Sequence, residues 1–281
     1  MARELDSTAI MRINERRQML VLADLADEHE PIPAEHGGGV VAYKRGVRWL
    51  CGAIGCGIDT PLTPEGARYI AEYVASRGGR PRIDLTDESG QSAYVVAADA
   101  GLVLDETERV LARSLSGPVK IPEIDGLSVE KLDPDHEAHL RAHAEHTTWG
   151  FTPEGIEPSA GELEATVRSL VHPRSRGFLA SIDGELAGTC GMEVISVEPS
   201  PGQGSVRVAS LWGAVVGEGF RRRGIQQALI ARRLLQGQAE GCSAAVIECQ
   251  PGIPTERNAV RLGFGLAYTR LAFRAPAGDS G

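Results

Sequence analysis

The chain has 281 residues and a formal net charge of −9, with 42% hydrophobic and 24% charged residues. This composition is typical of a soluble globular protein and excludes a disordered or fibrous chain. A sequence pI near 5.4 argues against a nucleic-acid-binding protein, which would carry a basic surface. At roughly 150 residues per domain, the length fits one large domain or two of moderate size.

The cysteines and the N-terminal segment favour a cytoplasmic protein. The five cysteines include no Cys-x-x-Cys pair, which argues against a structural zinc site, and their odd number fits reduced thiols. Glu4, Asp6 and Glu15 favour a polar N-terminal helix over a signal peptide. No apolar run approaches the ~18 residues that a membrane span needs. We therefore expect no metal, nucleic acid or membrane as partner, and a monomer or homodimer.

Helices and strands alternate in the first 120 residues. The expected elements are a helix over 6–30, strands over 40–43 and 48–54, a helix from Pro64 to Gly78, a strand over 82–85, a helix over 92–100 and a strand starting at 102. Ser116-Gly117-Pro118 and Pro122 then favour a linker. We predict two domains, over residues 1–120 and 121–281.

The pattern is clearer after the linker. The expected elements are a strand over 127–132, helices over 133–148 and 161–171, strands over 177–182, 185–197 and 206–216, a helix over 222–238, a strand over 244–249, a helix over 255–262 and a strand over 266–275. Asp183-Gly184 predicts a hairpin turn between the second and third of these strands.

Charge is unevenly distributed along the chain. Residues 1–120 carry a net −4, residues 121–204 a net −10 and residues 205–281 a net +5. A basic segment in an acidic protein favours an anionic ligand, although surface charge also fluctuates without a function.

A glycine-rich turn joins the strand over Val206–Val216 to the next helix. It reads Gly217-Glu218-Gly219-Phe220-Arg221-Arg222-Arg223-Gly224-Ile225-Gln226. The first N–H groups of a helix have no partner within the helix, and the helix dipole favours negative charge there. Three arginines add charge-assisted hydrogen bonds, so the turn is suited to phosphate. The spacing matches neither a dinucleotide fingerprint nor a P-loop, and a capped helix with a solvated arginine face is the alternative.

The run Arg221–Gln226 resembles the Gln/Arg-x-x-Gly-x-Gly/Ala pyrophosphate loop of the Gcn5-related N-acetyltransferase (GNAT) family, with Gln226 in place of the final small residue. The predicted element order from Leu127 onward is similar too. The resemblance implies an α/β (α+β) fold with a mixed, mostly antiparallel sheet flanked by helices, and acetyl-CoA as co-substrate without a metal. It implies these cofactor-binding residues, in which the strand end pairs with pantetheine and the loop holds the pyrophosphate: Ala214, Val215, Val216, Arg221, Arg222, Arg223, Gly224, Ile225, Gln226, Gln227, Thr255 and Asn258.

Two positions depart from the family pattern. Gly252 stands where the family often has an Asn, and Ala259 stands where it often has the Tyr that protonates the leaving thiolate. Tyr268, on the last predicted strand, is the candidate acid nearby; the alternatives are protonation of the thiolate by water and its stabilisation by the helix around Thr255–Asn258. Glu248 stands where many members hold a base, and a carboxylate there can deprotonate an ammonium through water. The alternative for Glu248 is a salt bridge with Arg257.

The first half resembles a degenerate copy of the same fold. Residues 48–100 repeat the element order that follows Val206, but residues 58–65, at the position of the phosphate loop, contain no Arg or Gly and carry Asp59 and Glu65. Carboxylates repel pyrophosphate. We therefore predict two GNAT-like domains in tandem, of which only the second binds acetyl-CoA; an unrelated α/β domain is the alternative.

Four histidines lie on one face of the helix predicted over 133–148: His136, His139, His143 and His146. Their spacing favours a half-solvated stripe over a metal site, and acceptor binding or base chemistry stays open. The surrounding glutamates would attract a cationic amine. Trp149 and Phe151 could line its pocket, with plain packing as the alternative.

We conclude that the sequence favours an N-acetyltransferase that transfers acetyl from acetyl-CoA to a primary amine of a small molecule or peptide by direct attack. Oriented reactants and backbone N–H groups near Val216 would supply the catalysis. The missing Tyr at position 259 leaves two alternatives: an acyl-CoA decarboxylase or thiol acyltransferase on the same fold, and a non-catalytic acyl-CoA-binding protein.

Overall fold

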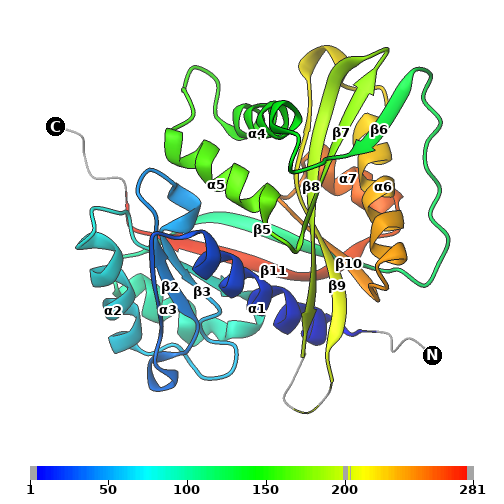
Figure 1. Cartoon of the computed structure of the whole chain (residues 1–281). Coiled ribbons are helices and arrows are strands. Elements are labelled where there is room, and N and C mark those ends of the chain that lie inside the picture. The colour runs from blue at the N-terminus through cyan, green and yellow to red at the C-terminus, as the bar shows by residue number, and fades with distance from the viewer. Residues whose placement is uncertain (1–4, 199–201, 203, 277–281) are drawn as a thin grey trace. The chain divides into compact units, whose positions relative to one another are not determined.

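The computed structural model describes residues 5–198, 202 and 204–276, which form two compact units (Figure 1). Residues 7–110 and 266–276 make up the N-terminal unit. Residues 5–6 and the described residues of 111–265 make up the C-terminal unit. Contacts therefore group the chain from Leu266 onward with the first part of the sequence, rather than with residues 121–265. The division into functional domains at residue 120 stays a prediction.

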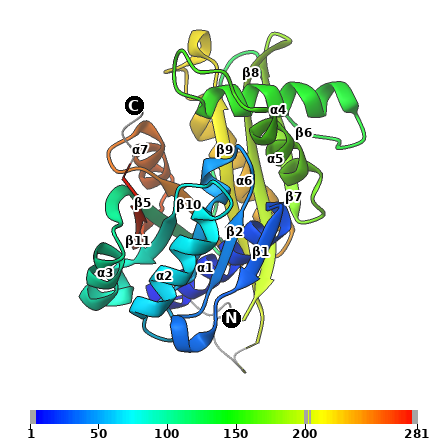
Figure 2. The ribbon, with the colours of Figure 1, turned by 90° about the vertical axis from the view of Figure 1, so that its left-hand side faces the viewer.

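The N-terminal unit is a mixed sheet with three α-helices. Its elements are α1 (Ser7–Leu25), β1 (Glu28–Pro31), β2 (Val40–Tyr43), β3 (Gly52–Ile54), α2 (Pro64–Ala75), β4 (Arg82–Thr86), α3 (Gly90–Asp99), the first part of β5 (Val103–Ser114) and most of β11 (Gly265–Arg274). The strand order is β1-β2-β3-β4-β11-β5. β3 and β4 pair in parallel, whereas β1/β2, β2/β3 and β4/β11 pair antiparallel. Figure 2 shows α2 and α3 next to each other, in contact.

Local sequence explains most of these elements. The Thr63 hydroxyl accepts a hydrogen bond from the Gly66 N–H at 3.1 Å and caps α2, whose Pro64 stands in the first turn. Ile70 and Val74, four residues apart, are fully buried on the inner face of α2. The helix predicted over 6–30 ends earlier, at Leu25. The exposed residues Glu28–Pro31 instead form the edge strand β1, which the sequence did not predict because it lacks alternating apolar residues.

The C-terminal unit contains the second sheet. Its elements are β6 (Leu127–Lys131), α4 (Glu137–Phe151), α5 (Ala160–Val171), β7 (Ser175–Ile182), β8 (Glu185–Val197), β9 (Val206–Val216), α6 (Ile225–Ala239), β10 (Ala244–Cys249) and α7 (Pro254–Arg261). The strand order is β10-β9-β8-β7-β6, with the end of β5 beside β10. In Figure 1, α4 and α5 lie on one side of β7–β9, and α6 lies on the other. The predicted bounds of β8, β9 and β10 are confirmed.

Packing on α6 positions the functional site. Leu229, Ile230 and Leu234 of α6 are fully buried and belong to one core cluster with Met192 of β8 and Ile247 of β10. The first turn of α6 is therefore held rigidly at the end of β9. Each unit combines an open, mostly antiparallel sheet with flanking helices, which confirms the predicted fold class.

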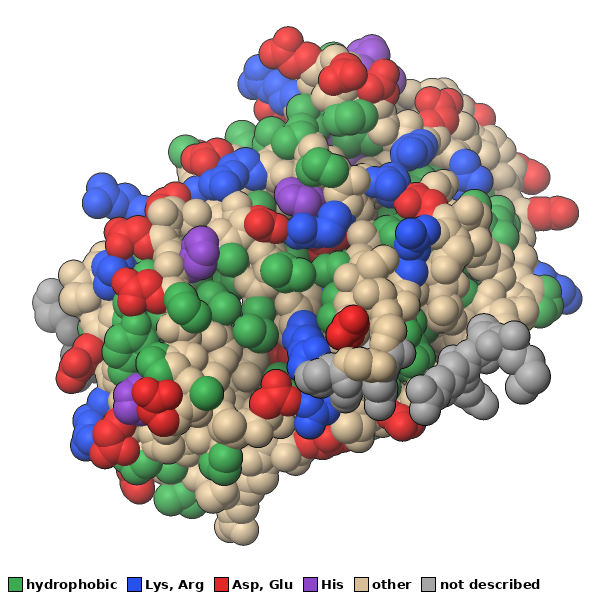
Figure 3. Space-filling model, turned by 60° about the horizontal axis from the view of Figure 1, so that its bottom comes forward, with side chains coloured by type: hydrophobic (Ala, Val, Ile, Leu, Met, Phe, Trp, Pro, Cys, Tyr) green, Lys and Arg blue, Asp and Glu red, His purple; other side chains and the backbone are tan. Residues whose placement is uncertain are grey.

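Charged side chains are mixed on the face drawn in Figure 3. Basic and acidic groups alternate there with apolar ones, and the basic groups do not form one continuous surface. Within the described part of the chain, every helix is too short or too polar to cross a membrane.

Candidate functional site

Strands β9 and β10 separate before they end. Their parallel pairing runs from Val208–Ala244 to Leu211–Ile247. β9 continues to Val216 and β10 to Cys249, so the last residues of both strands leave an open split. Ala214, Val215 and Val216 lie on one arm of the split, while Glu248 lies on the other. The edge of β9 that no longer pairs with β10 offers N–H and C=O groups to an extended ligand.

A β-bulge redirects β9 at the start of the split. Thr189 pairs with Val215 and Gly191 pairs with Trp212, so two residues of β9, Gly213 and Ala214, face a single residue of β8. Gly213 has φ +61°, a left-handed conformation that glycine adopts without a Cβ penalty. After the bulge, β9 pairs with β8 again through Val215 and Val216, whereas its pairing with β10 has already ended at Leu211.

Arg233 of α6 holds this bulge from inside the core. Its Nη1 donates to the carbonyl oxygens of Gly191 at 3.0 Å and Trp212 at 3.2 Å, and its Nε donates to Leu229 O at 3.1 Å. The side chain is fully buried, and desolvation lowers the pKa of the guanidinium. The sequence offers no signal for this role, because nothing local distinguishes the buried Arg233 from its half-buried neighbour Arg232.

The glycine-rich turn forms the start of α6. Gly224 is the N-cap, with φ +85°, and the first bond of the helix is Ala228 N–H to Gly224 O at 3.1 Å. The N–H groups of Ile225, Gln226 and Gln227 precede that bond and have no acceptor within the helix. The side chains of Arg221, Arg222 and Arg223 are exposed at the same end. The arrangement combines free N–H groups, the positive end of a helix dipole and three guanidinium groups.

Amide hydrogen bonds join α6 to α7. Gln226 Nε2 donates to Thr255 Oγ1 at 2.8 Å, and Asn258 Nδ2 donates to Gln226 Oε1 at 2.6 Å. Gln227 Nε2 donates to Asn258 Oδ1 at 3.0 Å. The structure therefore brings together four of the predicted cofactor-binding residues, and their side chains hold one another. Gln226, the departure from a small residue, supplies two of these three bonds.

A pocket opens beside the end of β9. Its volume is about 510 Å³. It is lined by Ala142, Glu145, His146, Trp149 and Gly150 of α4, Leu186 of β8, Val215 and Val216 of β9, and Gly217, Glu218 and Arg221 of the turn. A methyl group on Gly150 would come within 2.3 Å of the Val215 side chain, so only glycine lets α4 approach β9 here. Another pocket, of about 440 Å³ near Ser196 and Arg207, contains none of the predicted residues.

Family comparison assigns this arrangement. Residues 140–264, which include the pocket, the split strands and the turn, match the model of the acetyltransferase (GNAT) family. These residues form a GNAT domain. No curated protein matches the chain.

Solved structures extend the likeness to the whole chain. A GCN5-related N-acetyltransferase from Kribbella flavida superposes with a TM-score of 0.66 at 17% identity, covering 99% of this chain and 98% of that one. One from Sphaerobacter thermophilus gives 0.56 at 18% identity, covering 89% and 78%. A tandem GNAT protein from the clavulanic acid biosynthesis pathway gives 0.58 at 14% identity, covering 98% of each chain. These likenesses show the fold: two GNAT-like halves in one chain.

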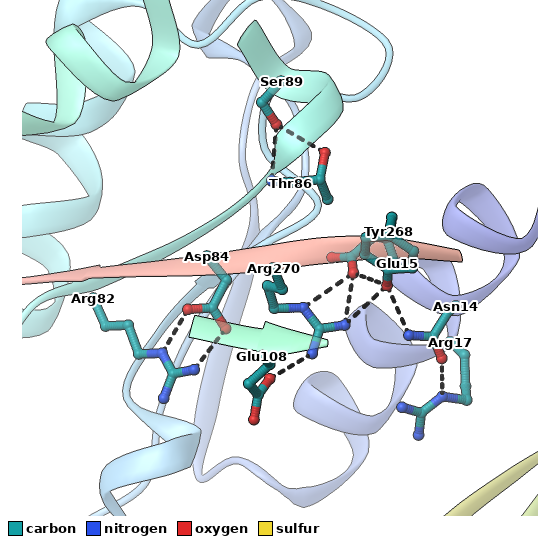
Figure 4. Close-up of polar contacts among 10 residues, drawn as sticks. All are labelled: Asn14, Glu15, Arg17, Arg82, Asp84, Thr86, Ser89, Glu108, Tyr268 and Arg270. Atoms are coloured by element: carbon teal, nitrogen blue, oxygen red, sulfur yellow. Dashed lines mark hydrogen bonds and ion pairs between the residues drawn. The ribbon is translucent and has the colours of Figure 1, made fainter. Parts of the chain in front are cut away.

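The predicted catalytic residues fall in different units. Glu248 is half-buried on β10, within the GNAT domain. Tyr268 belongs to the N-terminal unit, where it is 2% exposed, and its hydroxyl donates to Glu15 and accepts from Asn14 Nδ2 at 2.8 Å (Figure 4). The hydroxyl is thus engaged in a buried network, and this arrangement gives no support to a role in protonating a thiolate. Ala259 of α7, at the usual position of the acid, is fully buried.

The four histidines separate into two pairs; His136 is the N-cap of α4, and the other three lie within the helix. His136 caps the helix through Nδ1, which accepts from the His139 N–H at 3.3 Å, so the helix starts after His136 and not at the predicted Asp133-Pro134. The rings of His136 and His139 stack at 3.8 Å and are exposed. His143 is fully buried, and His146 lines the pocket. Helical spacing predicted that the histidines share a face. It could not predict that His136 and His139 are exposed while His143 is buried and His146 half-buried.

Two further expectations about the acceptor side are resolved in part. Trp149 lines the pocket and is 55% exposed, whereas Phe151 is 65% exposed and is not part of the lining. Of the glutamates expected to attract an amine, Glu145 reaches the pocket, where it accepts from Arg141 Nε at 2.7 Å. Glu162 instead caps α5 together with Ser159.

Acid should destabilise the GNAT domain through His143. Burial lowers the pKa of this ring from 6.5 to about 4. Between these two pH values His143 is therefore protonated in the unfolded chain and neutral in the folded protein. The stabilising contribution is complete above pH 6.5 and is lost as the pH falls toward 4, by up to about 3 kcal/mol. Urea titrations at pH 7, 6, 5 and 4 measure this loss. In His143→Gln, whose amide can still donate to the same carbonyl, the decline between pH 6.5 and 4 should be shallower; an unchanged decline would contradict the assignment.

Proposed function

We propose that the protein is an acetyl-CoA-dependent N-acetyltransferase that acts on a primary amine of a small molecule or peptide. The observation that carries the proposal is the open split between β9 and β10, which leads directly into the phosphate-suited first turn of α6. Acetyl-CoA supplies an acetyl group activated as a thioester. The protein's part is to orient both reactants and to stabilise the charge that develops on the carbonyl oxygen.

The residues of the split and of the turn bind the co-substrate in this proposal. The backbone of Ala214, Val215 and Val216 pairs with the pantetheine amides, and the N–H groups from Arg222 to Gln227 hold the pyrophosphate. The strand edge that no longer pairs with β10 suits the amides, and the N–H groups at the helix terminus suit the pyrophosphate. Thr255 and Asn258 support the turn through their bonds to the two glutamines.

The pocket beside Val216 receives the amine in this proposal. Glu145 and Glu218 give it carboxylates, and residues 121–204 carry a net −10, which attracts a cation. Trp149 adds an apolar wall, which favours an amine with an apolar part next to its nitrogen. Glu248, on the other arm of the split, removes a proton from the incoming ammonium through water.

The N-terminal unit has a structural role in this proposal. Asp59 and Glu65 occupy the region that corresponds to the phosphate loop, where Asp59 forms ion pairs with Arg12 and Arg16 of α1 and Glu65 pairs with Arg68 at 2.9 Å. These carboxylates disfavour a pyrophosphate. We also propose a cytoplasmic location, since the five cysteines are all buried and reduced.

Two measurements test the proposed function. Calorimetry with acetyl-CoA should show binding to one site, and thiol release should then follow with at least one of spermidine, lysine amide, tyramine and kanamycin. Absence of acetyl-CoA binding would reject the proposal as a whole. Binding without thiol release from any amine would favour a non-catalytic acyl-CoA-binding protein, while release with a thiol acceptor alone, or loss of CO₂ from a malonyl thioester, would favour the other alternative.

Replacing Glu248 by Gln should move the pH optimum of thiol release upward. Without the carboxylate, the acceptor must lose its proton to solvent, and the fraction of free amine rises with pH. A pH–rate profile for the best amine measures the shift, with Glu256→Gln, at a half-buried carboxylate in the first turn of α7, as the matched control. An unchanged profile would leave Glu248 as a structural residue.

A further inference from the structure

His146 connects the pocket to a buried hydrogen-bond chain. Its Nδ1 lies 3.0 Å from the hydroxyl of Thr189, a fully buried residue of β8. Its Nε2 lies beside the Gly217 backbone, where a methyl group on Gly217 would be 3.7 Å away. Both His146 and Gly217 line the pocket. The nitrogen on the pocket side is therefore Nε2, and its protonation state decides what the ring can do to a bound ligand.

His143, at the end of this hydrogen-bond chain away from the pocket, sets the direction of all its hydrogen bonds. His143 Nε2 lies 3.0 Å from the carbonyl oxygen of Cys190, which can only accept, so Nε2 carries the hydrogen. A neutral imidazole has one N–H, which leaves His143 Nδ1 to accept from the Thr147 hydroxyl at 3.2 Å. The lowered pKa of His143, about 4, keeps that ring neutral near pH 7.

The same direction continues to the pocket. Having donated to His143, the Thr147 hydroxyl accepts from the Thr189 hydroxyl at 2.9 Å. Thr189 in turn accepts from the Nδ1–H of His146. One proton on His146 is thereby fixed at Nδ1, and Nε2 presents a lone pair to the pocket. The carbonyl group of Cys190 on β8 thus selects the tautomer of His146 through a series of four hydrogen bonds.

We propose that His146 is the base that takes the proton of the acceptor amine, an assignment that rests on the function proposed above. The amine nitrogen bonds to the thioester carbonyl carbon, the C–S bond breaks, and CoA leaves as a thiolate. The proton lost by the nitrogen passes to His146 Nε2, and solvent supplies a proton to the thiolate. The imidazolium then returns its proton to solvent. Glu248 acts earlier, when an ammonium first becomes an amine.

The surroundings of His146 suit this task. Burial lowers the pKa of the ring, so it is free base at neutral pH. The charged side chains that line the pocket with it are Glu145 on its own helix, and Glu218 and Arg221 on the turn after β9. β8 contributes uncharged groups, Thr189 and Leu186. When the ring takes up a proton, Nδ1–H keeps its bond to Thr189, and the two carboxylates in the pocket favour the new charge.

Histidine NMR tests the tautomer without an acceptor. In the full chain labelled with ¹⁵N-histidine, at pH 7.5, His146 should be protonated at Nδ1 with Nε2 free. Thr189→Val should release the constraint and populate the Nε2–H form, whereas Thr189→Ser, which restores the hydroxyl, should keep the original tautomer. His146 protonated at Nε2 in the wild-type protein would overturn the proposal.

Kinetics test the role of the base. With acetyl-CoA and the fastest amine of the panel, His146→Ala should lower kcat by about 100-fold, a typical loss for a general base, and imidazole should restore part of it. Thr189→Val should lower kcat by roughly tenfold because the wrong nitrogen faces the pocket. The acidic limb of the kcat profile, with a midpoint below pH 6.5, should disappear in His146→Ala. His139→Ala, on the exposed turn of α4, is the matched control and should match wild type.

The outcomes separate this proposal from the function on which it rests. Calorimetry should show unchanged acetyl-CoA affinity in His146→Ala. If wild type releases thiol and His146→Ala retains its kcat and its acidic limb, His146 is not the base, although the acetyltransferase function stands. If wild type binds acetyl-CoA and releases no thiol from any amine, the proposed function fails, and the base role fails with it.

Discussion

Gly224→Asp should reduce acetyl-CoA affinity by roughly 100-fold, or about 3 kcal/mol, while leaving the fold intact. Gly224 is the N-cap of α6 and has φ +85°, a conformation that Asp tolerates better than most residues. An Asp at an N-cap accepts hydrogen bonds from the first N–H groups of its helix. Those are the groups that the pyrophosphate needs, and the carboxylate also repels it. Calorimetry with acetyl-CoA measures the loss.

The opposite end of the same helix provides the control. Gly241 follows α6, has φ +73° and has one neighbouring atom within 4 Å of an added methyl group, at 3.9 Å on Arg207. Gly241→Asp therefore introduces the same charge in a similar backbone conformation, far from the first turn, and should preserve affinity. Gly224→Ala adds a Cβ without a charge, so it tests the close approach of the backbone to the ligand alone. It should lose less acetyl-CoA affinity than Gly224→Asp. Normal binding by Gly224→Asp would refute the phosphate-binding role of this turn.

Short-range sequence signals predicted the elements of the GNAT domain. The Asp183-Gly184 turn separates β7 from β8, and the Gly-rich run after Val216 marks where β9 ends. These features depend on residues that are neighbours in sequence, so one chain is sufficient to predict them. The phosphate-suited character of α6 follows from its first turn for the same reason.

Features that depend on distant partners could not be predicted in this way. Arg233 follows Arg232 in α6, and two of its three acceptors are carbonyl groups of β8 and β9, which are distant in the sequence. His146 differs from His139 only in what the fold places beside it, because Thr189 lies 43 residues away. Local sequence also could not predict that β11 groups with residues 7–110. Its partner β4 lies far away in the sequence, since Arg82 pairs with Arg274.

Glu15 is the clearest case. Its charge helped to predict a polar helix at the N-terminus, yet the residue is fully buried. Arg270 of β11 donates to Glu15 Oε1 from Nη2 at 2.6 Å and from Nε at 3.1 Å, and also donates to Glu108 Oε2 at 3.1 Å (Figure 4). Arg270, 255 residues later in the sequence, thus offsets the cost of burying the Glu15 carboxylate.

Arg270→Met should therefore destabilise the protein by about 3–5 kcal/mol. The substitution keeps an apolar chain of similar length but leaves Glu15 buried without its cation, and the cost of that uncompensated charge exceeds the value of the pair itself. Urea unfolding followed by circular dichroism measures the loss. Arg68→Met, which removes the exposed pair with Glu65, is the matched control in the same unit and should cost less than about 1 kcal/mol.

The double variant separates the buried charge from lost packing. If the unpaired carboxylate causes the loss, Glu15→Gln combined with Arg270→Met should recover much of it, because an amide costs far less to bury than a charge. The coupling energy between the two positions should then be at least about 1 kcal/mol. A double variant as unstable as the sum of the single variants would place the loss in packing around β11. Since Tyr268 donates to the same carboxylate, Tyr268→Phe should reduce stability rather than the rate of thiol release, which also tests where this residue acts.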